Sequence, residues 1–174
     1  MTTTCARCTT DEDYAKVSSF LIERRHDLHL SYMTMDMVTL LYNYITEGHL
    51  LQITNDEGDV LAAGAYYHGT PEHNFLDKGT VLVDFTVFDQ AVRGTRLFLK
   101  GLKYLVEAIR AAHPEVQEIR MAAFADNVYV CNLYAKFNTS SYTRQGEIGE
   151  EIIFCSDLDS LWTRLQKFDR LNLK

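Results

Sequence analysis

The sequence has little proline and glycine and no long hydrophobic run. Its 174 residues include 2 Pro and 9 Gly, too few for a flexible linker, so we expect a single folded domain over residues 1–174. No apolar run approaches the roughly 18 residues of a membrane span, so we expect no membrane partner. The N-terminus, MTTTCARCTTDED, has neither the basic nor the apolar segment of a secretion signal. These absences favour a cytoplasmic protein with reduced cysteines.

Basic residues are also few. The sequence has 17 Lys and Arg against 24 Asp and Glu, and its formal net charge is −7 at pH 7. Such a surface repels phosphate backbones, so we expect no nucleic-acid partner, whereas a cationic partner is compatible with it. The apolar fraction of 47% is ordinary for a globular protein with a sizeable core.

The cysteines raise one metal-binding alternative. Cys5-x-x-Cys8 is followed by His26-x-x-His29, which superficially resembles a zinc site of two cysteines and two histidines. The histidine spacing is too short for a zinc finger, and the stretch between the pairs reads as one amphipathic helix. We therefore expect no metal.

Hydrophobic periodicity predicts a mixture of strands and helices. The expected elements, in chain order, are a strand at 3–9, a helix begun by Thr10, a helix near 34–48, a hairpin at 49–69, a strand at 80–88, a helix ended by His113-Pro114, a strand at 116–124, a helix near 126–138, a hairpin at 141–155 and a last helix capped by Ser156. This order fits one α/β sheet of mixed direction. A doubly wound nucleotide-binding fold would alternate strand and helix throughout, and this chain does not.

Two of the helices have a stripe that we expect to face the core. Residues Phe98, Leu102, Leu105 and Ile109 recur at i, i+4, i+7 and i+11. In the helix near 34–48 we assign the inward stripe to Met35, Val38, Tyr42 and Ile45.

Two stretches resemble a known family. The strand TVLVDFTVF (80–88) runs through DQAVRGTR into a long helix, and a later helix contains NVYVCNLYAKFN. With the element order, these stretches resemble the GNAT N-acetyltransferase superfamily. Its members have R-G-x-G-x-G/A at a helix start after a strand, and an Asn followed by Leu-Tyr in a later helix. The resemblance implies an α/β (α+β) fold with a single mixed, mostly antiparallel sheet of about six to seven strands and helices on both faces.

The glycine motif is incomplete. Arg93-Gly94 matches its first pair, but Arg96 and Phe98 stand where the second and third glycines are expected. Those glycines let backbone N–H groups approach a pyrophosphate closely, although a helix N-terminus attracts phosphate without any particular side chain. We expect Phe98 to point away from the ligand, because it begins the core stripe of its own helix.

The resemblance implies an N-acyltransferase, most simply an N-acetyltransferase, acting by direct transfer in a ternary complex. The acyl donor is acetyl-CoA or another acyl-CoA, and the acceptor is an amine of a small molecule or a protein. The implied cofactor contacts are Val87 and Phe88 along the thioester arm, Arg93, Gly94, Thr95 and Arg96 at the pyrophosphate, and Asn127. Tyr134 matches the tyrosine that protonates the departing thiolate.

Asp84 is the polar exception in an apolar strand. Burial of its carboxylate would suit a general base, with His68 and His73 as alternatives. We assign Tyr66 and His68 to the acceptor groove. The alternative function is a catalytically inactive GNAT-like binding or assembly module that does not use acyl-CoA. Pairing of the last helix and hairpin between subunits makes a homodimer possible.

Overall fold

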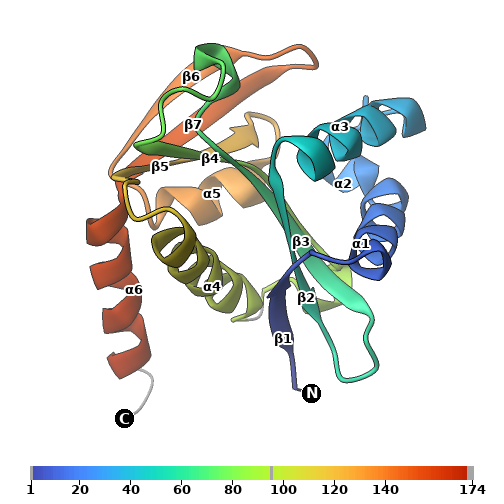
Figure 1. Ribbon diagram of the computed structural model, residues 1–174, viewed down its shortest axis with the longest axis horizontal. Helices are drawn as coiled ribbons and strands as arrows, with labels where there is room; N and C mark the ends of the chain where they lie inside the picture. Colours follow the sequence, from blue (N-terminus) through green and yellow to red (C-terminus); the bar gives the residue numbers. More distant parts are fainter. Residues whose placement is uncertain (1, 95, 172–174) are drawn as a thin grey trace. The chain divides into compact units, whose positions relative to one another are not determined.

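The computed structural model describes residues 2–94 and 96–171 (Figure 1). The elements in this part of the chain are β1 (Thr4–Arg7), α1 (Asp11–Glu23), α2 (Arg25–Leu28), α3 (Thr34–Thr46), β2 (His49–Thr54), β3 (Val60–His68), β4 (Thr80–Phe88), α4 (Leu97–Ala112), β5 (Glu118–Phe124), α5 (Val128–Ala135), β6 (Ser140–Gln145), β7 (Glu150–Asp157) and α6 (Leu158–Leu171). Short 3-10 turns lie at Pro71–His73 and Gln90–Val92. None of the described helices combines the length and the apolar character that crossing a membrane requires.

Seven strands form one sheet in the order β1-β2-β3-β4-β5-β7-β6. The β1–β2, β2–β3, β5–β7 and β6–β7 pairs are antiparallel. The Gln117 N–H donates to the Gly79 carbonyl at 2.8 Å, so β4 and β5 begin side by side, with α4 as the crossover between them. The predicted fold class, a single mixed and mostly antiparallel sheet of six to seven strands, is confirmed.

The chain divides into two compact units, which share the strands of this sheet. The first comprises Met1–Tyr67 and Val83–Thr95, and the second His68–Leu82 and Arg96–Lys174. Strand β4 therefore belongs to both units. The expectation of a single domain stays a prediction.

In the first unit, local signals position α1. The Thr10 hydroxyl accepts a hydrogen bond from the Asp13 N–H, and the Asp13 carboxylate accepts one from the Thr10 N–H, each at 3.1 Å. This capping box satisfies N–H groups that the first turn of a helix leaves open. The hairpin of β2 and β3 also forms as predicted, with Gly58 at a φ of 86° in its turn.

The stripe predicted for α3 is wrong. Met37, Leu41 and Tyr44 are the buried residues of this helix, whereas the residues predicted to be inward are exposed by at least two-fifths of their surface: Met35, Val38, Tyr42 and Ile45. Both sets recur at helical spacing, so the periodicity alone did not choose between them. The choice is made by tertiary partners of Tyr44 that lie far away in the sequence.

In the second unit, the helix stripes match the sequence more closely. Phe98, Leu102, Leu105 and Ile109 are all buried, and α4 ends before His113 as predicted. The start of α6 needs a correction: Asp157, rather than Ser156, caps it, because the Asp157 carboxylate accepts from the Ser160 N–H at 2.8 Å. The Asp157 carboxylate therefore lies at the N-terminus of α6, where its negative charge interacts favourably with the positive end of the helix dipole.

Two methionines of α3 test the corrected stripe. Met37 is 0% exposed and Met35 is 70% exposed. Met37→Ala should therefore lower the free energy of unfolding by about 2–5 kcal/mol, because it leaves a cavity. Met35→Ala, the matched control, should change it by less than about 0.5 kcal/mol in urea unfolding. Equal losses in the two variants would contradict the corrected stripe.

Candidate active site

The Asp84 carboxylate lies at the centre of an aromatic cluster in the first unit. The buried Tyr44 hydroxyl, from α3, donates a hydrogen bond of 2.5 Å to Asp84 Oδ2. The Tyr44 ring also meets the Phe85 ring edge-on, with 5.4 Å between centroids. The carboxylate is half-buried, and a phenol that donates to it stabilises its ionised form.

A second tyrosine completes the cluster. The Tyr67 ring, from β3, stacks on Tyr44 with centroids 4.4 Å apart. Burial, and after it the charge of Asp84, raises the pKa of Tyr67 to about 12 and holds the pKa of Tyr44 well above its ordinary value. Both phenols therefore stay protonated at neutral pH, and Tyr44 donates its proton to the hydrogen bond with Asp84. The proton acceptor of this cluster is Asp84.

Tyr66, the neighbour of Tyr67 in the sequence, is the tyrosine that we assigned to the acceptor groove from the sequence. Tyr66 is buried on β3, and its ring packs against His49 with 4.6 Å between centroids. The His49 Nδ1 in turn lies 2.5 Å from an Arg7 guanidinium nitrogen. Tyr67 is thus the β3 tyrosine stacked in the Asp84 cluster, while the assignment of Tyr66 to the acceptor stays a prediction. Tyr44 was missed because the inward stripe of α3 was misassigned.

The loop after β4 is held by ion pairs of the first unit. The Asp89 carboxylate accepts from the Ala91 N–H at 2.8 Å and pairs with the Arg24 guanidinium. The Arg93 guanidinium lies 3.4 Å from Asp27 Oδ1. Val87 and Phe88 are buried, so their contribution to a ligand would come from the backbone.

Gly94 has the backbone that its predicted role needs. Its φ is 77°, a left-handed conformation that favours glycine, and a Cβ built there would meet no atom within 4 Å. The backbone at Gly94 is therefore open to close approach. Thr95 lies outside the described residues. Arg96 is the N-cap residue of α4, and both Arg93 and Arg96 are exposed.

The second unit holds the other predicted residues on α4 and α5. Tyr134 is 0% exposed, and its ring packs near Phe98 and Phe154 with centroids 6.0 and 5.9 Å apart. Phe98 faces this core, as predicted. Asn127 caps α5, because its side-chain oxygen accepts from the Val130 N–H at 3.3 Å. The contacts of Asn127 and Tyr134 with a ligand stay predictions.

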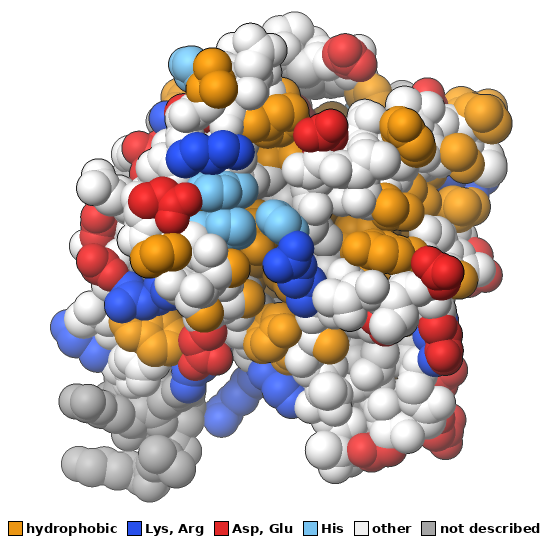
Figure 2. Space-filling view, viewed as in Figure 1, with side chains coloured by type: hydrophobic (Ala, Val, Ile, Leu, Met, Phe, Trp, Pro, Cys, Tyr) orange, Lys and Arg blue, Asp and Glu red, His pale blue; other side chains and the backbone are white. Residues whose placement is uncertain are grey.

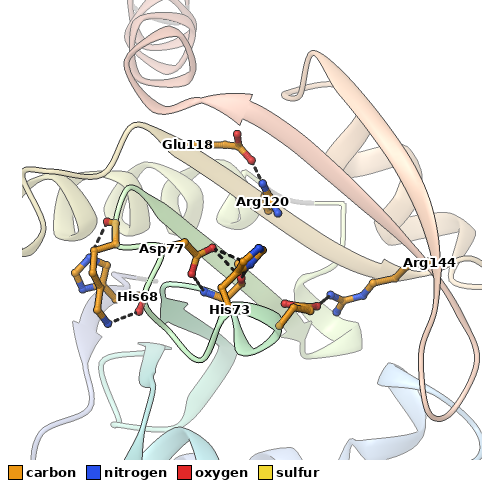
Figure 3. Close-up of polar contacts among 9 residues, drawn as sticks. His68, His73, Asp77, Glu118, Arg120 and Arg144 are labelled. Carbon is orange, nitrogen blue, oxygen red and sulfur yellow. Dashed lines mark hydrogen bonds and ion pairs between the residues drawn. The ribbon is translucent and has the colours of Figure 1, made fainter.

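The two histidines proposed as alternative bases have other partners, all in the second unit (Figure 3). The His68 Nε2 lies 2.9 Å from Glu115 Oε1. The His73 Nδ1 lies 2.8 Å from the Thr70 hydroxyl, which also donates to Asp77 at 2.8 Å. Neither arrangement includes Asp84, so the carboxylate and the two histidines belong to separate clusters.

The chain matches no protein-family model and no curated protein in sequence. Its fold, however, is that of GNAT-family acetyltransferases. A GNAT acetyltransferase from Staphylococcus aureus Mu50 has a TM-score of 0.70 at 10% identity, covering 90% of this chain and 99% of its own. The aminoglycoside acetyltransferase AAC(6')-Ib, in complex with coenzyme A and kanamycin, has a TM-score of 0.69 at 16% identity, covering 91% and 96%. An uncharacterized protein from Bacillus halodurans reaches 0.72 at 12% identity, covering 94% and 88%.

The phenol next to Asp84 offers a titration test. We expect Tyr67 to titrate at about pH 12, and Asp84→Asn to lower this pKa, because removal of the negative charge makes the phenolate easier to form. Because the unfolded chain ionises at the ordinary pKa of 10.0, stability from Tyr67 is complete below that pH and is lost as the pH rises through 12.

Tyrosine ring ¹³C NMR measures this pKa, with Tyr67→Phe to assign the resonance. The matched control is Asp56→Asn, which removes an exposed carboxylate in the β2–β3 turn. If Asp84→Asn leaves the pKa of Tyr67 unchanged, the Asp84 charge does not act on the Tyr67 phenol, and the two groups do not form one electrostatic cluster.

Proposed function

We propose that the protein is an acyl-CoA-dependent N-acyltransferase, and specifically an N-acetyltransferase that acts by direct transfer in a ternary complex. The observation that carries the proposal is the Asp84 carboxylate on the strand that leads into the Gly94 loop. This carboxylate accepts a hydrogen bond from the buried, neutral phenol of Tyr44, on which the Tyr67 ring stacks. The likeness of the fold to acetyltransferases that bind coenzyme A supports the choice of donor.

Asp84 is assigned as the general base. The acceptor amine attacks the thioester carbonyl carbon, and the proton that leaves its nitrogen passes to the Asp84 carboxylate, directly or through a water. Tyr44 donates to the same carboxylate and fixes its orientation, so it is a positioning residue. A positioned base of this kind contributes about 10²–10⁴-fold to the rate.

Tyr134 is assigned as the acid for the leaving group. When the carbon–sulfur bond breaks, the thiolate of coenzyme A takes up the phenolic proton. Tyr134 regains a proton from solvent, and Asp84 releases to solvent the proton that it took from the amine. The buried position of the Tyr134 ring among Phe98 and Phe154 supports a fixed geometry for this phenol. Backbone N–H groups of Val87 and Phe88 are assigned to the thioester arm, where such a donor stabilises the developing oxyanion.

The pyrophosphate is assigned to the backbone around Gly94 and to the exposed Arg96 side chain. The N-terminus of α4 adds open N–H groups and a positive dipole end, which together attract phosphate. Arg93 can contact the pyrophosphate only if its guanidinium leaves Asp27 Oδ1, which lies 3.4 Å away. Phe98, at the position of the third expected glycine, points into the core.

A small molecule with a primary amine is the proposed class of acceptor. AAC(6')-Ib, which has the same fold, is described in complex with kanamycin. The net charge of −7 favours a cationic acceptor over an anionic one. An amine of a protein remains the second class of acceptor.

The second candidate is a GNAT-like binding module that does not use acyl-CoA. The observation in its favour is that both charged residues flanking the loop turn are already paired, Asp89 with Arg24 and Arg93 with Asp27. Isothermal titration with acetyl-CoA separates the two candidates. Saturable binding that Arg96→Ala weakens supports the transferase, and absence of binding at millimolar ligand supports the module.

The base assignment predicts a specific kinetic loss. Asp84→Asn keeps the shape of the side chain and an oxygen that accepts from Tyr44, but it removes the proton acceptor. With a primary-amine panel and acetyl-CoA, kcat should fall by about 10²–10⁴-fold while acetyl-CoA affinity is retained. Asp56→Asn, which removes one exposed charge from the same unit, should leave kcat unchanged. An unaffected rate in Asp84→Asn would remove this residue from the reaction.

The positioning role of Tyr44 predicts a change in pH dependence. Tyr44→Phe removes the hydrogen bond that favours the ionised carboxylate, so the base becomes protonated at a higher pH. The acid limb of the kcat/KM profile should therefore move to higher pH, whereas a purely structural loss would lower the profile at all pH values. Tyr134→Phe should lower kcat without moving this limb.

A further inference from the structure

Two histidines and a glutamate converge at the surface of the second unit. His68 ends β3, His113 follows α4, and Glu115 comes two residues later in the turn before β5. One ligand atom from each of the three side chains lies within 4.8 Å of the others. Figure 2 shows histidine side chains grouped beside acidic and basic ones on one face of the molecule, and Figure 3 shows the His68 contacts.

Two oxygen atoms lie at hydrogen-bonding distance from His68 Nε2. Glu115 Oε1 lies 2.9 Å from this nitrogen, and the Lys78 carbonyl oxygen lies 3.0 Å from it. A single N–H cannot point straight at two acceptors. A tetrahedral Zn²⁺ with bonds of about 2.0–2.1 Å has ligand atoms about 3.3 Å apart, so side-chain shifts of donors that already lie within 4.8 Å of one another would give this spacing.

The geometry points to a binding site for one divalent transition metal ion, which we propose is Zn²⁺, at His68, His113 and Glu115. Two imidazole nitrogens and one carboxylate oxygen form a donor set that zinc prefers, with a fourth position for water or the Lys78 carbonyl. Binding requires a neutral His68 ring, so the proton on Nε2 leaves when the metal takes its place. The proposal departs from the sequence-based expectation of no metal, and it does not depend on the proposed acyl transfer.

Backbone hydrogen bonds hold the turn that carries His113 and Glu115. The His113 N–H donates to the Ile109 carbonyl at 2.8 Å, and the His113 carbonyl accepts from the Val116 N–H at 3.1 Å. Pro114 limits the freedom of this turn. The His68 and His113 rings stack, with centroids 3.9 Å apart, so the two imidazoles are already neighbours. Because the lone pairs of an imidazole lie in its ring plane, one of the stacked rings turns when both bind the same ion.

The surroundings set a moderate affinity. Glu115 has a side chain that is 49% exposed and His68 one that is 17% exposed, so an ion reaches the site from solvent. The Lys78 ammonium donates to the His68 carbonyl at 2.9 Å, and its charge opposes a nearby cation. The cysteines compete poorly, since burial raises the pKa of Cys8 to about 12 and raises those of Cys131 and Cys155.

Equilibrium dialysis of the whole chain, purified without a polyhistidine tag, measures the site directly. We expect one Zn²⁺ per chain, and a thermal midpoint Tm that rises with added Zn²⁺. His113→Ala and Glu115→Gln should each raise the Kd at least about tenfold and abolish the rise in Tm. Co²⁺ in place of Zn²⁺ should give the visible bands of tetrahedral cobalt without thiolate charge-transfer absorption.

Two controls keep the test specific. His73→Ala removes a histidine of the same unit whose ring contacts Thr70 instead, and Glu147→Gln removes an exposed carboxylate. Both should retain Zn²⁺ with the affinity of the original chain. Circular dichroism of the metal-free variants verifies that Glu115→Gln folds. If the original chain does not bind Zn²⁺, or if neither His113→Ala nor Glu115→Gln changes the Kd, the proposal is overturned.

Discussion

The hydrogen bond from Tyr44 to Asp84 joins α3 to β4 within the first unit. A half-buried carboxylate on an apolar strand is costly unless a donor compensates it, and a bond to a charged acceptor is worth about 1.5–3 kcal/mol. The bond needs the Tyr44 face of α3 to point inward, so it also decides which side of that helix is exposed. The Tyr67 ring stacks on Tyr44 and extends the same cluster. Burial raises the pKa of both phenols, and the charge of Asp84 raises it further.

Most of the fold could be predicted because its signals are local. The Gly58 turn, the capping box of Thr10 and the α4 stripe each depend on residues within a few positions of one another. The α3 stripe could not be chosen locally, because this helix has apolar residues on most of its circumference. Its inward face depends on Asp84, which is 40 residues from Tyr44 in the sequence. The buried face was selected by a polar partner, which a count of apolar spacings does not include.

The candidate site was predictable to the same extent. Asp84 was visible as a single polar residue in an apolar strand, and Gly94 as a glycine between a strand and a helix. Tyr67 was not separable from Tyr66, because alternation along β3 gives the two tyrosines opposite faces without saying which face meets Asp84. Of the histidine–glutamate cluster, only His113 and Glu115 are close together in the sequence, on either side of Pro114. Its third member, His68, joins it through the strand pairing of the fold.

In the loop after β4, ion pairs compensate the charged side chains beside Gly94. Asp89 would repel a phosphate, but the Arg24 guanidinium neutralises it within the first unit. Asp27 neutralises Arg93 in the same way, so neither charge dominates the loop. The backbone at Gly94, with a φ of 77° and no atom within 4 Å of a Cβ built there, stays open to close approach. The residues at the two later glycine positions differ in their surroundings. Arg96 is exposed, whereas Phe98 is buried because the core stripe of α4 begins with it.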